Sequence, residues 1–95
     1  MQNIIDRLQR IVILHSYIYY NLDDSVISDF EYNSKAHRLA EYKNNYPELW
    51  KNSKYYKQFG DDYDGSTGYG LYERLDPEQQ EIIRYIAKFR HEKEN

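Results

Sequence analysis

Near the N-terminus, apolar residues recur at intervals of three and four, which places them on one face of an α-helix. We predict a helix from about Asn3 to Leu22. Tyr17 and Tyr20 fall outside the apolar face, whereas His15 lies in its middle and is expected to be a core histidine. The residues that form the predicted face are Ile4, Leu8, Ile11, His15, Ile18 and Leu22, widened by Ile5, Val12 and Tyr19.

A second helix is predicted after a short break. The segment Asp23-Asp24-Ser25 holds residues that prefer to bond their own backbone. Ser28 and Glu31 then form a capping box, so the helix should begin there and end at about Asn45, before Tyr46-Pro47. The inner face of this helix should carry an acid, small residues and tyrosines, namely Asp29, Tyr32, Ala36, Leu39, Ala40 and Tyr46.

The helical pattern weakens beyond Pro47. Pro47–Trp50 predicts one helical turn and Ser53–Phe59 a short helix, and the glycine- and aspartate-rich segment 60–70 predicts a loop that is either functional or flexible. Asp76-Pro77 is a typical helix start, so a third helix should span residues 76–91 and be followed by a fraying tail. Its apolar face should comprise Leu75, Ile82, Ile83, Ile86 and Phe89.

These elements predict an all-α fold in a single domain, residues 1–95. Two long helices form a hairpin, short helical segments and a loop occupy residues 51–75, and a third helix closes the domain. A chain of 95 residues supports only one modest core.

Composition restricts the classes of function. The net charge of −3 and the absence of a basic cluster argue against a nucleic-acid partner. The chain has no cysteine, which excludes disulfides, thiol nucleophiles and thiolate metal sites. The apolar run at residues 11–14 is too short to cross a membrane and no signal-peptide pattern is present, so we expect a cytoplasmic protein. Twelve tyrosines suit half-wet surfaces and indicate an interface with a ligand or another chain.

Three patterns that could carry chemistry are better explained as ordinary structure. The segment Gly65-Ser66-Thr67-Gly68 could cradle a phosphate but lacks the lysine of a P-loop, so a turn is the simpler interpretation. The acidic run at residues 61–64 lacks the spacing of a calcium loop, and the three histidines lack metal-ligand spacing. We therefore expect no metal site, no catalytic residue and no enzymatic activity.

The corner where the first two helices meet is the remaining candidate. Asp29, Tyr32 and Asn33 stand at i, i+3 and i+4 and so share one helix face, and Tyr19 and Tyr20 end the preceding helix. In one interpretation Tyr19 and Tyr32 point inward and pack in the core. In the other the corner is a slot for a flat nucleotide ring, where tyrosines stack on the ring. Asp29 and Asn33 would then bond amide or ribose groups, and Tyr20 would reach a phosphate.

Three segments resemble one known family: His15-x-Tyr17-x-Tyr19-Tyr20-x-x-Asp23, Ile27-Ser28-Asp29-x-Glu31-Tyr32 and Tyr46-Pro47-Glu48-Leu49. Over residues 1–50 they resemble, in order and spacing, the N-terminal Ia domain of bacterial NAD-dependent DNA ligases. In that family the domain binds the nicotinamide mononucleotide (NMN) half of NAD and presents it for adenylyl transfer. The resemblance implies ligand-facing positions at Tyr19, Tyr20, Asp29, Tyr32 and Asn33. Asn33 replaces an aspartate that is usual in the family, which should weaken the preference for a cationic nicotinamide.

The other ligase domains are missing from this sequence, so the resemblance implies binding without ligation. We expect a non-catalytic binder of NAD, NMN or a cyclic ADP-ribose-like nucleotide. Free-standing proteins similar to this domain are typical of phage genomes, which suggests a sponge that sequesters an NAD-derived immune signal. One hairpin offers too little surface to enclose a whole dinucleotide, so a homo-oligomer, in which a second copy closes the pocket, is expected. The alternatives are a protein-interaction module that docks on a host protein such as the host DNA ligase, and an enzyme that hydrolyses or cyclises nucleotides.

Overall fold

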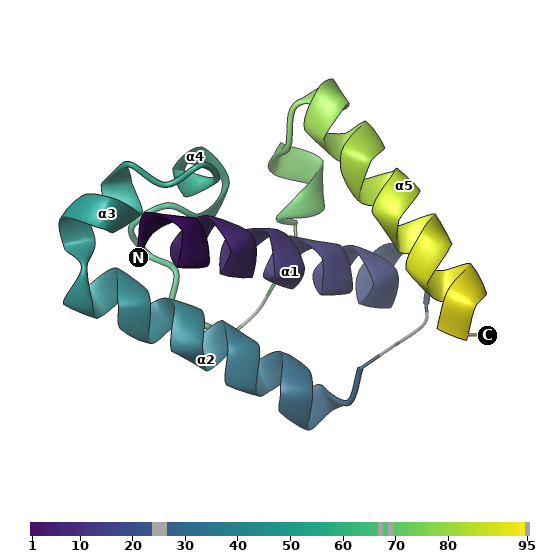
Figure 1. Cartoon of the computed structure of the whole chain (residues 1–95), viewed down its shortest axis with the longest axis horizontal. Helices are drawn as coiled ribbons and strands as arrows, with labels where there is room; N and C mark the ends of the chain where they lie inside the picture. The colour runs from purple at the N-terminus through teal and green to yellow at the C-terminus, as the bar shows by residue number, and fades with distance from the viewer. Residues whose placement is uncertain (24–26, 67, 69, 95) are drawn as a thin grey trace.

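The hairpin predicted from the sequence is present. The computed structural model describes residues 1–23, 27–66, 68 and 70–94, with side chains described up to Phe89. Helix α1 (Gln2–Asn21) and helix α2 (Asp29–Asn45) run in opposite directions, and their ribbons diverge towards the end where α1 stops and α2 begins (Figure 1). The Ser28 hydroxyl accepts a hydrogen bond from the Glu31 amide at 3.1 Å, which confirms the predicted helix cap. The break at residues 24–26 lies outside the described residues.

Helix α1 is the central element and is covered on several sides. Val12, Ile13 and Leu14 are consecutive and all buried, because α2, α3 and α5 pack on different faces of α1. His15 is buried as expected. The prediction of a single apolar stripe was therefore too narrow, and it was wrong at its ends, where Ile4 and Leu22 are exposed. On α2, Ala36, Leu39 and Ala40 are buried as predicted, but Asp29 and Tyr46 are exposed.

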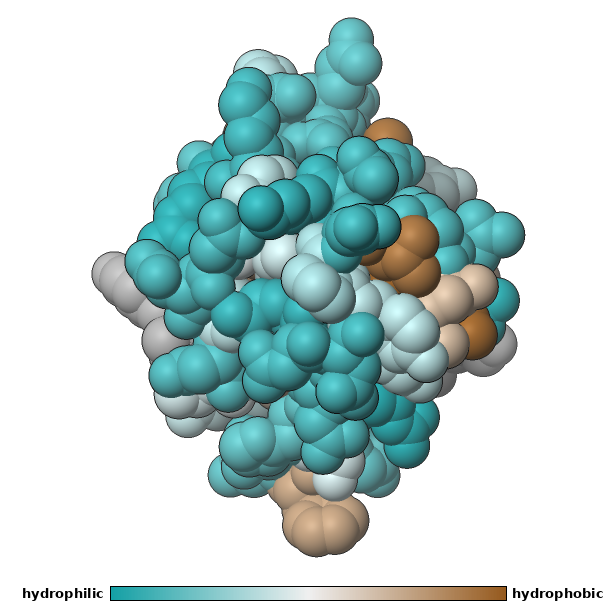
Figure 2. Space-filling view, turned by 90° about the vertical axis from the view of Figure 1, so that its left-hand side faces the viewer, coloured by the Kyte–Doolittle hydropathy of each residue, from teal (hydrophilic) through white to brown (hydrophobic). Residues whose placement is uncertain are grey.

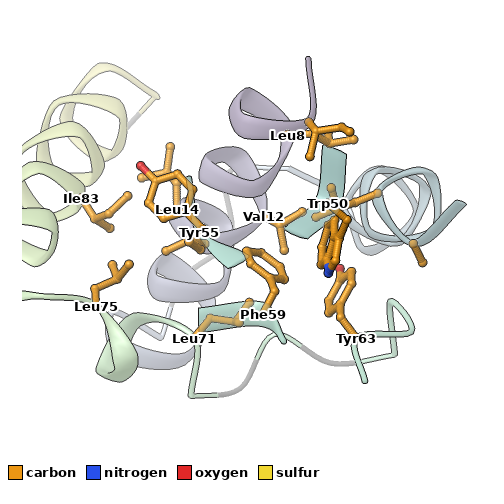
Figure 3. Packing of buried hydrophobic residues seen from close by; sticks show 14 of the residues in the cluster. Leu8, Val12, Leu14, Trp50, Tyr55, Phe59, Tyr63, Leu71, Leu75 and Ile83 are labelled. Atoms are coloured by element: carbon orange, nitrogen blue, oxygen red, sulfur yellow. The ribbon is translucent and has the colours of Figure 1, made fainter. Parts of the chain in front are cut away.

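Short helices and an aromatic cluster close one end of the hairpin. Helix α3 (Pro47–Lys51) is the predicted turn, and α4 (Tyr56–Phe59) is the second half of the predicted segment 53–59. The indole ring of Trp50 stacks on the ring of Tyr63 with centroids 6.0 Å apart, and Phe59 meets Tyr63 edge-on at 4.8 Å. The Trp50 indole nitrogen donates to the Gly60 carbonyl at 2.9 Å. Figure 3 shows these three rings together beside Val12.

The C-terminal helix α5 (Pro77–Glu94) is inclined to α1 and packs against it towards the end of α1 (Figure 1). It continues three residues beyond the predicted end at 91. Leu75, Ile83 and Ala87 are buried, and Ile83 lies near Leu14 and Leu75 in Figure 3. A 3₁₀ turn, η1 (Tyr72–Arg74), precedes α5 and was not predicted. Ile82 and Phe89 are 53% and 61% exposed, so their predicted place in the buried face was wrong.

The loop at residues 60–70 packs on the hairpin. The described residues of this segment contain neither helix nor strand, as predicted. Tyr63, Gly65 and Gly68 are nevertheless buried, and the Tyr63 hydroxyl donates to the Ala36 carbonyl at 3.5 Å. A Cβ on Gly65, whose φ is +83°, would lie 2.9 Å from the same carbonyl oxygen. The loop is thus a structural layer over α2.

Three further observations concern the surface, membrane-spanning helices and metal sites. The face at the left of Figure 1 is mostly hydrophilic, with apolar side chains in small separate areas (Figure 2). No helix in the described part of the chain is long and apolar enough to cross a membrane. Among the described residues, no group of histidines and acids is arranged to hold a metal ion.

Candidate functional site

A hydrogen bond between Ser16 and Tyr32 fixes how α1 and α2 meet at the tyrosine–aspartate corner. The Ser16 hydroxyl donates its single proton to the Val12 carbonyl at 2.7 Å. The Tyr32 hydroxyl, 2.7 Å from Ser16 Oγ, is therefore the donor of the second bond. Burial raises the pKa of Tyr32 above its usual value, and the Tyr20 phenol raises it further. The Tyr32 hydroxyl therefore uses its proton in a hydrogen bond that joins α2 to α1.

One helical turn beyond this bond lie the other predicted site residues. Tyr20 follows Ser16 by four positions and Asp29 precedes Tyr32 by three. Because α1 and α2 are antiparallel, both residues lie nearer the diverging ends of the hairpin than the Ser16–Tyr32 bond does. Tyr20 stands one helical turn beyond Ser16 on the same face of α1, on the side where Ser16 meets Tyr32. Asp29 and Asn33 are exposed on α2, and only the helix register places them beside Tyr32.

Tyr19 and Tyr20 form an exposed aromatic pair. Their rings meet edge-on with centroids 4.9 Å apart, and their side chains are 54% and 46% exposed. The prediction that Tyr19 points inward was wrong, because α2 diverges from the last turn of α1 and no longer covers it. Tyr32, predicted to lie on the inner face of its helix, is half-buried. Both rings therefore reach the surface of the molecule at this corner.

Gly68 packs against the inner side of this corner. A Cβ at this position would lie 2.0 Å from Ser16 Oγ and 2.2 Å from the Tyr32 hydroxyl oxygen. The backbone of Gly68 therefore rests directly on the Ser16–Tyr32 hydrogen bond. Sequence reasoning missed both Ser16 and Gly68. The only signal was that Ser16 stands one turn before Tyr20 on the same helix face.

The loop itself is a poor phosphate cradle. Hydrogen bonds from the side chain and the amide of Ser66 lower the pKa of Asp64, and the amide donates to the carboxylate at 2.9 Å. Gly68 is buried against the hairpin. Thr67, the third residue of the Gly65–Gly68 segment, lies outside the described residues. The described contacts of this segment fit the interpretation of it as a turn.

Comparison with known protein families identifies the first part of the chain. Residues 1–56 match the model of the DNA ligase-like, N-terminal NAD⁺-binding domain. The chain belongs to this family. Searches of curated proteins and of solved structures returned no match. The resemblance seen in the sequence is thereby confirmed, and NAD⁺ binding is the function of the family.

The family match divides the structure at the start of α4. It covers α1, α2 and α3, and it includes Tyr19, Tyr20, Asp29, Tyr32 and Asn33. The loop that carries Gly68, the turn η1 and helix α5 lie beyond it. The corner therefore lies within the part of the chain that matches the NAD⁺-binding family, whereas the loop that carries Gly68, the turn η1 and helix α5 lie beyond it.

Proposed function

We propose that this protein binds NAD, NMN or another NAD-derived nucleotide at the corner formed by Tyr19, Tyr20, Asp29, Tyr32 and Asn33. One observation carries the proposal. The positions that the family resemblance selects lie together at the diverging ends of α1 and α2, with an exposed pair of tyrosine rings in contact, in a chain that belongs to an NAD⁺-binding family.

The chemistry of the corner suits a nicotinamide ring. The oxidised ring is cationic and flat, and tyrosine faces attract such rings by cation–π interaction, worth about 0.5–1 kcal/mol at exposed sites. The carboxylate of Asp29 adds an opposite charge, and the amide of Asn33 can bond the carboxamide of the ligand. Binding by stacking and hydrogen bonding needs no nucleophile or base, so the proposal includes no turnover.

A sequestering role is the specific form of this proposal. An exposed pair of tyrosine faces can stack on any flat base or pyridine ring, so the same corner could hold a cyclic ADP-ribose. A sponge requires affinity and stoichiometric amounts, not catalysis. In this role the protein acts in the cytoplasm, where the nucleotides are, and in the host cytoplasm if a phage encodes it.

Titration calorimetry with NAD, NMN and cyclic ADP-ribose tests the proposal. Asp29→Asn should weaken NMN binding about tenfold, which corresponds to about 1.4 kcal/mol. Glu31→Gln is the matched control, because Glu31 is also an exposed acid in the first turn of α2 but does not share the face of Tyr32. The proposal is wrong if none of the three nucleotides binds, or if both substitutions weaken binding equally. Chromatography of the recovered nucleotide tests the absence of turnover.

We also propose a homo-oligomer, formed through α5. Ile82, Tyr85 and Phe89 stand at i, i+3 and i+7 and are 53%, 74% and 61% exposed. They form an apolar stripe on the side of α5 opposite the buried residues Ile83 and Ala87. Such a stripe supports pairing with a second copy of the same helix.

A further inference from the structure

A second group of polar and aromatic side chains lies beside the proposed nucleotide site. The rings of Tyr17 on α1 and Tyr72 on η1 are 4.4 Å apart between centroids and tilted by 46°. Nη1 of Arg84 on α5 donates to the Tyr72 hydroxyl at 2.7 Å. Three elements that are distant in sequence therefore meet at one guanidinium group, and two of them lie outside the family match.

This group continues the row of tyrosines that begins at the corner. Tyr17 precedes Tyr20 by three positions, so the two side chains are neighbours on the surface of α1. Around α1 the order is Tyr32, Tyr20, Tyr17 and Tyr72, with Arg84 last. Two aromatic rings separate Tyr20 from the guanidinium. The row thus joins a surface suited to a cationic ring with a surface suited to an anion.

Within the described part of the chain, one hydrogen bond of the Arg84 guanidinium is seen, to Tyr72. A guanidinium has five N–H donors, and the bond to Tyr72 uses one of them. The Tyr72 hydroxyl accepts from Arg84, so its own proton can be donated to a ligand. The bond to Tyr72 raises the pKa of Arg84, and the Glu81 carboxylate raises it further. Glu73, next to Tyr72 in the chain, accepts a bond from Asn21 at 3.3 Å. The guanidinium of Arg84 is thus a cationic hydrogen-bond donor that can hold an anion, with the carboxylate of Glu81 nearby.

We propose that Arg84 and the Tyr72 hydroxyl form a phosphate subsite for the nucleotide whose ring binds at Tyr19 and Tyr20. This inference rests on the proposed function and adds to it a preference for phosphorylated ligands. Arginine holds phosphate by paired N–H bonds in a fixed plane, and Tyr72 orients the guanidinium. The nucleotide would then bridge α1 and α5, so the part of the chain beyond the family match would take part in recognition.

The test compares NMN with nicotinamide riboside, which has the same ring and ribose but no phosphate. The wild-type protein should bind NMN more tightly than the riboside. Arg84→Gln should weaken NMN binding about tenfold, a loss of about 1.4 kcal/mol, and leave riboside binding unchanged. Tyr72→Phe should show a smaller loss with the same selectivity. Arg7→Gln, an exposed arginine in the first half of α1, is the matched control and should change neither affinity.

Each other outcome has a distinct meaning. If the wild-type protein binds NMN and Arg84→Gln binds it equally well, or loses NMN and riboside in parallel, the phosphate subsite is wrong and the nucleotide site stands. If the wild-type protein binds neither ligand nor NAD, the proposed function itself is wrong. Thermal unfolding of Arg84→Gln shows whether a loss of binding arises from a loss of folding.

Discussion

Gly68 is the residue whose size most directly sets the shape of the candidate site. Any side chain there would overlap Ser16 Oγ and the Tyr32 hydroxyl, because an added Cβ would lie 2.0 Å and 2.2 Å from them. Gly68→Ala should push the Tyr32 phenol away from Ser16 and lower the free energy of unfolding by about 1–3 kcal/mol, the usual range for overpacking. Urea denaturation measures this change.

The same substitution should also weaken nucleotide binding, since Tyr32 would no longer be held at the corner. Asp62→Ala is the control, because Asp62 is an exposed residue of the same loop. An alanine at position 68 that leaves both stability and affinity unchanged would show that the loop does not rest on Tyr32.

Gln9 is a buried polar residue that the apolar pattern of α1 did not reveal. Its side-chain nitrogen donates to Ser53 Oγ at 2.8 Å, and its oxygen accepts from the Tyr55 amide at 3.2 Å. Gln9→Leu is more apolar and similar in size, yet it should destabilise the protein by about 1–3 kcal/mol because the buried Tyr55 amide loses its acceptor. Urea denaturation tests this, with Arg7→Leu on the exposed side of α1 as the control; equal stability of the two variants would contradict it.

At the scale of elements, the features that could be predicted are those set by residues within one helical turn. The limits of α2 follow from Ser28, Glu31 and Pro47, whose effects act within one turn, and the structure confirms them. Which faces are buried depends on neighbours that are distant in sequence. A single stripe on α1 assumes one covered side, but this helix is covered on several, so Ile13 and Leu14 are buried together while Tyr19 is exposed.

The residues of the candidate site also differ in whether the local sequence could identify them. Tyr20, Asp29 and Tyr32 were found because they lie within one hairpin and match a known spacing. Ser16 could be judged only after its partner was known. Arg84 reaches the site through Tyr72 and Tyr17, from elements separated by more than 50 residues in the chain. No local periodicity carries that information, because it arises from how α5 packs on α1.

Three tyrosines that are buried or half-buried predict a loss of stability at alkaline pH. Burial raises the pKa of Tyr63, Tyr55 and Tyr32 above the value near 10 that free tyrosine has. The folded state thus holds these phenolic protons more tightly than the unfolded state does. Their contribution to stability is complete below about pH 10 and is lost as the pH rises further.

Circular dichroism and phenolate absorbance, followed together from pH 8 to pH 13, measure this effect. Unfolding should accompany the ionisation of the buried tyrosines. Tyr63→Phe should move the alkaline transition to higher pH, whereas Tyr85→Phe, which alters an exposed ring, should not. Ionisation of all twelve tyrosines near pH 10 without unfolding would refute the prediction.

At the scale of the whole molecule, the chain beyond the family match completes the core. Phe59, Tyr63, Leu71, Leu75 and Ile83 lie beyond residue 56, yet they belong to the same buried cluster as Trp50 and Leu14. A fragment of residues 1–56 would leave the apolar surface of α1 uncovered. It should show no cooperative thermal transition by circular dichroism, whereas residues 1–95 should show one; a sharp transition in the fragment would mean that the family region folds alone.

The exposed stripe of α5 leads to a prediction about assembly. Ile82, Tyr85 and Phe89 share one side of the helix, and Glu81 and Lys88, seven positions apart, flank it on the same edge. When a second copy lies antiparallel, Glu81 of each chain faces Lys88 of the other, so charge and apolar surface are matched together. Antiparallel pairing of α5 should therefore produce a homodimer whose population rises with protein concentration.

Analytical ultracentrifugation of the wild type, Phe89→Ser and the control Phe30→Ser tests this pairing. Phe30 is 80% exposed but belongs to α2 and not to the stripe of α5, so only Phe89→Ser should yield monomers. A wild-type protein that stays monomeric at high concentration, or a dimer that Phe30→Ser disrupts equally, would contradict the pairing. Because the stripe and Arg84 lie on different sides of α5, NMN affinity should be the same in the Phe89→Ser monomer. The nucleotide site would then be completed within one chain, by η1 and α5, without the second copy that the short hairpin suggested.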